Sequence, residues 1–216
     1  MALAYHREID QNTSFAIWKI EESAEELLTQ LQLKEHELSY LDTLNKGKRN
    51  LHWLSTRVLL RRMMDTDKYI DCKIDSNGKP YLNNFPHHIS LSHSYDYAAV
   101  MISKTKAVGI DIELIKDKIE RIAHKFLNKD ELDFIQDSNR VEHLYVCWCA
   151  KEAIYKLHGK RNISFLEHIT LDPFDFMGSG KFTANLIVKA RLRKFTVYYQ
   201  LFDGYMIGFV ADDYEE

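Results

Sequence analysis

Two acidic residues, Asp111 and Glu113, stand two positions apart in a stretch that the sequence predicts to be a strand, Ala107–Glu113. Because successive strand side chains point to opposite faces, both carboxylates project together while Ile110 and Ile112 are buried on the other side. Adjacent carboxylates repel each other unless a cation or protons lie between them. Such hard oxygen ligands suit Mg²⁺, which completes its shell with water and phosphate oxygens. The alternative is an amphipathic strand with a solvated acidic face.

A second group of chemically capable residues lies on a predicted long helix, Arg140–His158. Glu152 and Lys156 are four positions apart, in the favourable order for a surface ion pair worth about 0.3–0.5 kcal/mol. The indole of Trp148, one turn before Glu152, would be costly to leave on a solvated face, which argues for more than an ion pair. Helical spacing predicts an apolar face of Cys147, Ala150, Ile154 and Leu157, and a polar face of Lys151, Glu152, Tyr155 and Lys156.

A third group combines Ser92-His93-Ser94 with Lys79, which lies in the turn signal Asp75–Pro80. A histidine and a lysine of this kind could hold phosphate groups. They could equally be a core histidine whose hydrogen bonds are formed within the protein, and an ordinary exposed lysine. Arg49 and Arg57, on the predicted helix Lys48–Met64, are either phosphate contacts or part of a solvated basic face.

Helices followed by short antiparallel strands are predicted twice along the chain, which indicates the α+β class. Two-residue connections, Tyr95-Asp96 and Asp203-Gly204, predict hairpins, and the connection Lys104-Thr105-Lys106 is short enough for another. The predicted helices are 21–31, 34–44, 48–64, 119–127, 129–136 and 140–158. The predicted strands are 15–20, 88–94, 97–103, 107–113, 169–171, 182–188, 194–202 and 205–211.

This repeated layout predicts two similar lobes, residues 1–106 and 107–216, each with a small antiparallel sheet packed on a long helix. The join falls near Thr105–Gly109, and no linker rich in proline, glycine or serine marks it. We therefore expect the two lobes to pack closely against each other.

The composition excludes several classes of protein. The 216 residues carry 29 Lys and Arg against 32 Asp and Glu, and the net charge of −3 argues against a nucleic-acid binder. No apolar run is long enough for a membrane span, and no secretory signal is apparent. Three cysteines without metal-site spacing predict a reduced, cytoplasmic compartment. P-loop, dinucleotide-binding and nucleophile-elbow motifs are absent from the sequence.

Taken together and in this order, the motifs GKP, LSHS, VGIDIE and WCAKEAIYK resemble the signature set of the 4′-phosphopantetheinyl transferase superfamily. The resemblance is to the double-length, surfactin-synthetase-activating (Sfp) type, and it covers roughly residues 45–160. It implies a pseudo-dimer of two α+β lobes with the active site at their interface. It also implies Mg²⁺-dependent transfer of the phosphopantetheine arm of coenzyme A to a serine of a carrier protein, with release of adenosine 3′,5′-bisphosphate.

The resemblance also implies a role for each matching residue. Glu152 and Lys156 would be catalytic, with Glu152 as general base and Lys156 beside the phosphates. The loop after the helix departs from the family pattern, since Gly159-Lys160-Arg161-Asn162 stands where the family often has Gly-Lys-Gly-Leu. The implied metal ligands are Asp111, Glu113 and Glu152, and the implied coenzyme A contacts are Arg49, Lys79, Ser92, His93 and Lys156. Lys48 or Arg57 could serve in place of Arg49.

The implied partners are coenzyme A and an apo acyl or peptidyl carrier protein. Such carriers are acidic, so a basic rim after the Asp111 strand, formed by Lys116, Lys118, Arg121 and Lys125, would suit them. That run could also be an ordinary charged helix surface. A single chain with both lobes is expected to act as a monomer. Two other functions remain open: a catalytically silent module that binds coenzyme A or carrier protein, and a Mg²⁺-dependent phosphohydrolase.

Overall fold

The computed structural model describes residues 3–44 and 47–213, and it has the predicted α+β architecture. The first half contains β1 (Leu3–Asp10), β2 (Thr13–Lys19), α1 (Ala24–Leu28), α2 (Glu35–Thr43), α3 (Lys48–Met64), β3 (Cys72–Ile74), β4 (Pro80–Leu82), β5 (His88–Ser94) and β6 (Tyr97–Ser103). The second half contains β7 (Lys106–Leu114), α4 (Lys129–Asp133), α5 (Arg140–His158), α6 (Phe165–His168), β8 (Ile169–Leu171), β9 (Ser179–Val188), β10 (Arg191–Phe202) and β11 (Tyr205–Asp213), with 3₁₀ segments at Asp117–Lys125 and Asp137–Asn139. None of the helices in these described ranges is long and apolar enough to cross a lipid bilayer.

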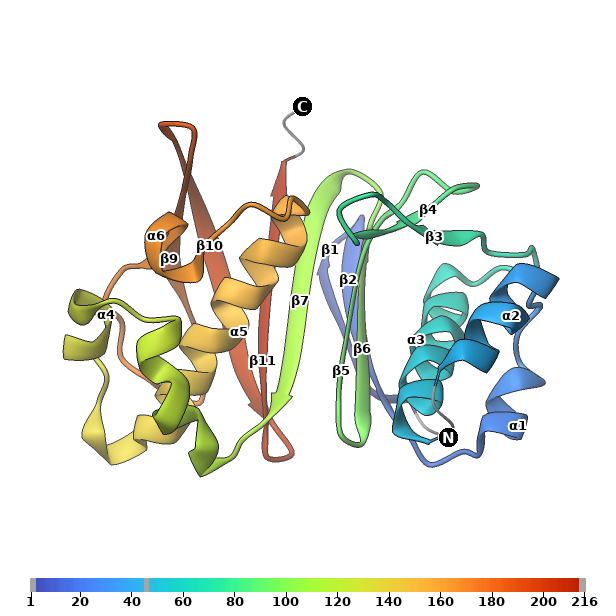
Figure 1. The fold of residues 1–216 in the computed structure, drawn as a ribbon, viewed down its shortest axis with the longest axis horizontal. Helices are drawn as coiled ribbons and strands as arrows, with labels where there is room; N and C mark the ends of the chain where they lie inside the picture. Colours follow the sequence, from blue (N-terminus) through green and yellow to red (C-terminus); the bar gives the residue numbers. More distant parts are fainter. Residues whose placement is uncertain (1–2, 45–46, 214–216) are drawn as a thin grey trace.

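Two antiparallel sheets lie back to back, and one long helix covers the outer face of each (Figure 1). The first sheet has the strand order β1-β2-β6-β5 and packs on α3. The second has the order β7-β11-β10-β9-β8 and packs on α5. Apolar side chains of both helices, such as Leu54 and Ile154, are buried against their sheets. The result is a stack of four layers: helix, sheet, sheet and helix.

An apolar core between the two sheets joins the halves of the chain. Phe15 and Met101 of the first sheet meet Ile110, Ile112 and Phe209 of the second, and all five side chains are almost fully buried. The rings of Phe15 and Phe209 lie with their centroids 4.7 Å apart. Each such side chain stabilises the fold by about 1.5–3 kcal/mol relative to an exposed position. The contact between the sheets is therefore a continuous part of the core.

The hairpin predicted between residues 97–103 and 107–113 is wrong. After β6 the chain leaves the first sheet, and β7 pairs with β11 in the second sheet. Val108, Ile110 and Ile112 form one face of β7 and are buried between the sheets, so β7 packs over the first sheet instead of extending it. The short connection at Lys104-Thr105 is the point where the chain changes sheets.

Most other predicted elements are confirmed, including the helices 48–64 and 140–158 and the strands 88–94 and 97–103. The Asp203-Gly204 hairpin is also confirmed, and both turn residues have a positive φ, as a type I′ turn requires. The sequence did not indicate β1 or α6. The segment predicted as a helix at 119–127 is a 3₁₀ segment at Asp117–Lys125.

Candidate active site

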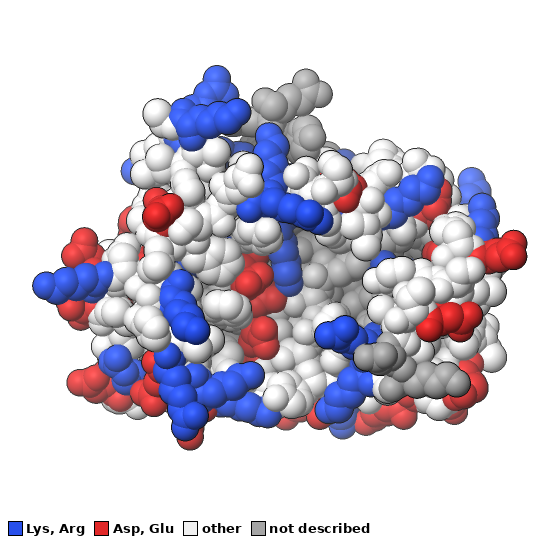
Figure 2. Space-filling view, viewed as in Figure 1, with Lys and Arg blue, Asp and Glu red and all other residues white. Residues whose placement is uncertain are grey.

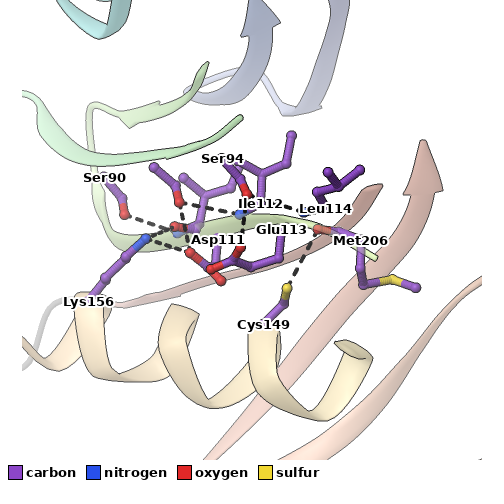
Figure 3. Close-up of polar contacts among 11 residues, drawn as sticks. Ser90, Ser94, Asp111, Ile112, Glu113, Leu114, Cys149, Lys156 and Met206 are labelled. Atoms are coloured by element: carbon purple, nitrogen blue, oxygen red, sulfur yellow. Dashed lines mark hydrogen bonds and ion pairs between the residues drawn. The ribbon is translucent and has the colours of Figure 1, made fainter. Parts of the chain in front are cut away.

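Asp111 and Glu113 lie on the face of β7 that is turned toward α5, as the two-residue strand period predicts (Figure 3). Ile110 and Ile112, on the other face, are fully buried between the sheets. Asp111 is only 4% exposed, whereas Glu113 is partly exposed. The acidic face is therefore buried beneath a helix, and the alternative of a solvated acidic strand is wrong for Asp111.

Two glycines let α5 lie directly on the second sheet. A Cβ atom added at Gly109 would stand 1.9 Å from the carbonyl oxygen of Ala153 in α5. One added at Gly208 of β11 would stand 2.8 Å from the carbonyl carbon of Cys149. Both neighbours are backbone atoms, which cannot turn aside as a side chain can. The close packing of α5 on β7 and β11 therefore depends on residues without a side chain.

We expect Gly109→Ala to destabilise the protein by about 1–3 kcal/mol, because the new methyl group overpacks the contact between β7 and α5. Urea unfolding measures this change. Gly180→Ala is the control, since the atoms nearest to an added Cβ there belong to the side chain of Tyr199, at 2.9–3.1 Å, and not to the backbone. An equal loss in both variants would contradict the special role of the Gly109 contact.

Lys156 reaches from α5 to β7 and forms an ion pair with Asp111. Its Nζ atom lies 2.7 Å from Asp111 Oδ1 and 3.1 Å from the carbonyl oxygen of Ile110, to which it donates a hydrogen bond. The alternative of a simple surface ion pair between Glu152 and Lys156 is therefore wrong, because Lys156 turns toward the strand. The ammonium group of Lys156 thus links α5 to the acidic face of β7.

Burial and neighbouring charge shift two carboxylates of this site, Glu152 and Glu113, toward the protonated form. Burial raises the pKa of Glu152 to about 7, and repulsion from Asp111 and Glu113 adds to the rise while Lys156 opposes it. Burial and repulsion from Asp111 also raise the pKa of Glu113. These shifts place three acidic groups within electrostatic reach of one another. A carboxylate with a pKa near neutrality can both take up and release a proton.

The donor chemistry of the site fits a divalent cation. Asp111 Oδ2 is buried and has no hydrogen-bond partner in the structure, so one oxygen remains available for a ligand. Within residues 3–44 and 47–213, no group of three or more His, Cys, Asp or Glu side chains is arranged to hold a metal ion. The three-ligand set of Asp111, Glu113 and Glu152 thus stays a prediction. Mg²⁺ usually needs only one or two carboxylates when phosphate oxygens complete its shell.

A pocket of 260 Å³ lies beside this acidic face, between the two halves of the molecule. The predicted residues Lys79, Glu152 and Lys156 all line it. Figure 2 shows the surface hollowed between the halves, with acidic and basic side chains around the hollow. The structure therefore brings three of the predicted site residues together, although they are up to 77 positions apart in the sequence.

Lys79 contacts the C-terminal end of α5. Its Nζ atom donates to the carbonyl oxygen of Leu157 at 2.6 Å, and burial lowers its pKa. Gly159, in the left-handed conformation, ends the helix, and a Cβ there would lie 2.4 Å from Lys79 Cδ. Arg161, which replaces a glycine of the family pattern, donates from Nε to the carbonyl oxygen of Asn77 at 2.8 Å. The loop after α5 thus closes against the turn between β3 and β4.

The remaining predicted contacts lie on β5 and at the start of α3. The ring of His93 stacks on that of His52 with centroids 4.2 Å apart. Loss of water around the stacked rings, with repulsion from His52 and Lys156, lowers the pKa of His93 to about 4, although the residue is exposed at the surface. Arg49 is exposed in the first turn of α3, one turn before His52. Ser92 is buried, and its hydroxyl donates to Asp111 Oδ1 at 2.7 Å.

Lys151 was predicted on the polar face of the helix, and this prediction is wrong. Its side chain is fully buried, and Nζ lies 2.8 Å from Oε2 of Glu131, which is also buried. The same ammonium donates to the carbonyl oxygens of Phe165 and Ile169 at 2.9 and 2.8 Å. The lysine of the motif therefore holds α4, α5, α6 and the start of β8 together.

The predicted basic rim begins at Lys116, whose Nζ lies 3.7 Å from the ring centroid of Tyr95. Lys48 of α3 approaches the same ring at 5.1 Å. Lys118, Arg121 and Lys125 are exposed on the 3₁₀ segment that follows. Exposed Asp117 and Glu120 lie on the same segment, so its surface carries both charges. The basic part that spans the two halves of the chain is the pair Lys116 and Lys48 at the ring of Tyr95.

Comparison with known proteins agrees with the resemblance carried by the motifs. Residues 107–210 match the sequence model of the family described as the 4′-phosphopantetheinyl transferase superfamily. This span includes Asp111, Glu113, Glu152 and Lys156, while the other predicted contacts lie before it. The resemblance to this family is thereby confirmed for the second half of the chain.

Three relatives are similar over part of the chain. The 4′-phosphopantetheinyl transferase psf-1 of Bacillus pumilus is 39% identical over 90 residues, which are 40% of this chain and 38% of that protein. The 4′-phosphopantetheinyl transferase gsp of Aneurinibacillus migulanus is 34% identical over 86 residues, 38% of this chain and 35% of its own. The 4′-phosphopantetheinyl transferase AcpT of Escherichia coli K12 is 29% identical over 120 residues, which are 53% of this chain and 60% of that protein. The chain thus spans 35% to 60% of the length of these three proteins.

Proposed function

We propose, from the similarity of this chain to the 4′-phosphopantetheinyl transferase superfamily, that it transfers the 4′-phosphopantetheine arm of coenzyme A to a serine of an apo acyl or peptidyl carrier protein. The serine oxygen would bond to the phosphorus that carries the pantetheine. The bond from that phosphorus to the oxygen of the adenosine-bearing phosphate would break, which releases adenosine 3′,5′-bisphosphate. The observation that carries this proposal is the convergence of Lys79, Glu152 and Lys156 on one pocket beside Asp111.

Glu152 is the proposed general base for this reaction. It lines the pocket, and burial raises its pKa to about 7, so it can accept the proton of the serine hydroxyl near neutral pH. Lys156 is the proposed partner of the leaving phosphate, because its ammonium already pairs with an anionic oxygen at 2.7 Å.

Asp111, Glu113 and Glu152 are the proposed residues for holding Mg²⁺. The partnerless Asp111 Oδ2 and the mutual repulsion of the carboxylates support this role. When bound there, the ion would neutralise charge on the diphosphate. Lys79, Ser92, His93 and Arg49 are the proposed contacts for the phosphates of coenzyme A. For Ser92, the hydrogen bond to Asp111 indicates a second role, which is to hold that carboxylate.

We further propose that residues 1–106 and 107–216 act as two lobes of a pseudo-dimer with the reaction at their interface. The helix–sheet layer in each half and the pocket between them support this division. A chain that supplies both sides of the pocket needs no second copy, which favours a monomer. The three unpaired cysteines support a reducing, cytoplasmic environment. The basic surface around Lys116 is the proposed contact for an acidic carrier protein.

Incubation with coenzyme A, Mg²⁺ and a panel of apo carrier proteins tests the proposed function. We expect the intact mass of at least one carrier to increase by one phosphopantetheine group. A carrier whose acceptor serine is replaced by alanine is the matched control and should not be modified. Chelation of Mg²⁺ should also prevent the increase.

The two other functions give different results in the same experiment. A catalytically silent module would bind coenzyme A in calorimetry and leave every carrier unmodified. A phosphohydrolase would cleave coenzyme A in the absence of carrier. Either result would contradict transferase activity. The pairing of Lys156 with Asp111 beside a carboxylate of raised pKa favours a working catalytic site over a silent one.

A further inference from the structure

Three serines at alternate positions of β5 hydrogen-bond to the backbone of β7. The hydroxyl oxygens of Ser90, Ser92 and Ser94 accept the backbone N–H groups of Ile110, Ile112 and Leu114 at 3.0, 3.3 and 3.2 Å, respectively. All three serines are at most 7% exposed. We call these three residues the serine row. They connect the first sheet to the second although β5 and β7 share no strand pairing.

The row covers the open edge of β7. One edge of β7 pairs with β11, and no strand of the described chain pairs with the other. An unpaired backbone N–H costs about 1–3 kcal/mol when it is buried. The serine hydroxyls supply the missing acceptors. This backbone role is common to all three residues.

Two members of the row make a second contact that the third does not. Ser92 donates to Asp111 Oδ1 at 2.7 Å. Ser94 donates to Glu113 Oε2 at 2.9 Å, as Figure 3 shows. In the part of the chain that the structure describes, Ser90 has no hydrogen bond to a carboxylate. A hydroxyl that accepts one bond and donates another is fixed in direction. Ser94 therefore holds the Glu113 carboxylate on the face of β7 that is turned toward α5.

We propose that Ser94 is a positioning residue that orients Glu113 for divalent-cation binding. The inference rests on the proposed function, in which Glu113 is a metal ligand. The Glu113 side chain can turn about three bonds, and the Ser94 hydrogen bond restricts that rotation before any ligand arrives. Partners that orient metal ligands in this way typically change metal affinity by 10–100-fold when they are removed.

Direct binding of Mn²⁺ to the protein in the presence of coenzyme A, followed by electron paramagnetic resonance of the free ion, tests this role. We expect Ser94→Ala to weaken Mn²⁺ binding by about 10-fold. Ser94→Thr keeps the hydroxyl and should restore the affinity. Ser90→Ala is the matched control, because it loses the same kind of backbone contact without touching a carboxylate. Ser90 also lines the pocket, so all variants are compared at saturating coenzyme A. The Mn²⁺ affinity of Ser90→Ala should equal that of the wild type.

Kinetics give a second measurement. Ser94→Ala should need more Mg²⁺ for half-maximal transfer, while kcat at saturating Mg²⁺ and the KM for coenzyme A stay near the wild-type values. The melting temperature should fall by a similar amount in Ser94→Ala and Ser90→Ala. A difference in Mn²⁺ affinity between the two variants then cannot come from a difference in stability.

Three results with the variants would overturn the role of Ser94. These are equal Mn²⁺ affinity in Ser94→Ala and the wild type, equal weakening in Ser90→Ala, and failure of Ser94→Thr to recover. Absence of Mn²⁺ binding by the wild type would overturn it as well. Absence of carrier modification by the wild type would instead overturn the proposed function, and the Mn²⁺ comparison would still decide whether Ser94 orients Glu113.

Discussion

Replacement of Glu152 by glutamine is expected to lower kcat for phosphopantetheine transfer by about 10²–10⁴-fold, the usual contribution of a general base. Glutamine has nearly the same shape as glutamate but cannot accept the serine proton. Because Glu152 is a largely buried carboxylate whose pKa is raised, its neutral replacement should not destabilise the fold. Single-turnover transfer to an apo carrier protein measures the rate.

Glu142→Gln provides the matched control for this prediction. It makes the same chemical change near the other end of α5, ten positions from Glu152 and therefore about 15 Å along the helix. Its rate should equal that of the wild type. Near-normal turnover by Glu152→Gln at saturating Mg²⁺ would show that another group removes the proton.

Lys151→Met is expected to destabilise the protein by about 3–5 kcal/mol, because it leaves the buried Glu131 carboxylate without its cation. The substitution also removes the donor to the carbonyl oxygens of Phe165 and Ile169. Urea unfolding at neutral pH measures the loss. Lys160→Met, at an exposed position just after α5, should change the free energy of unfolding by no more than about 0.5 kcal/mol.

A double variant separates the lost cation from the lost packing. Lys151→Met combined with Glu131→Gln removes both charges, while the amide oxygen can still accept the backbone N–H of Leu171. The double variant should recover at least about half of the stability lost in Lys151→Met, since the uncompensated charge is the main cost. If the double variant recovered none of the lost stability, the loss in Lys151→Met would be due to packing alone.

Local periodicity predicted the long helices and most strands, because their apolar residues recur at the period of the element. The edge strand β1 was missed, since most of its side chains are exposed and Arg7 interrupts its alternation of apolar and polar residues. The connection between β6 and β7 was misread for a different reason. Its length permits a hairpin, and only the burial of Ile110 and Ile112 between two sheets decides against it.

The candidate site was predictable where neighbours along one element decide the geometry. The shared face of Asp111 and Glu113 follows from the strand period alone. The burial of Lys151 does not, because its partner Glu131 lies 20 positions away on another helix. The serine row was visible as alternate serines in the segment 90–94, but the strand that it contacts was not. Helical spacing, likewise, could not show that Lys156 turns to Asp111 rather than to Glu152.

The serine row also limits how this protein could be recombined with its relatives. A chimera that takes one half from another protein would have to offer small hydroxyl side chains opposite every second amide of β7, at the same spacing. If the other protein has alanine or valine at these positions, the backbone N–H groups of β7 would face apolar side chains without an acceptor. Such a chimera should not assemble correctly even if each parent protein folds well.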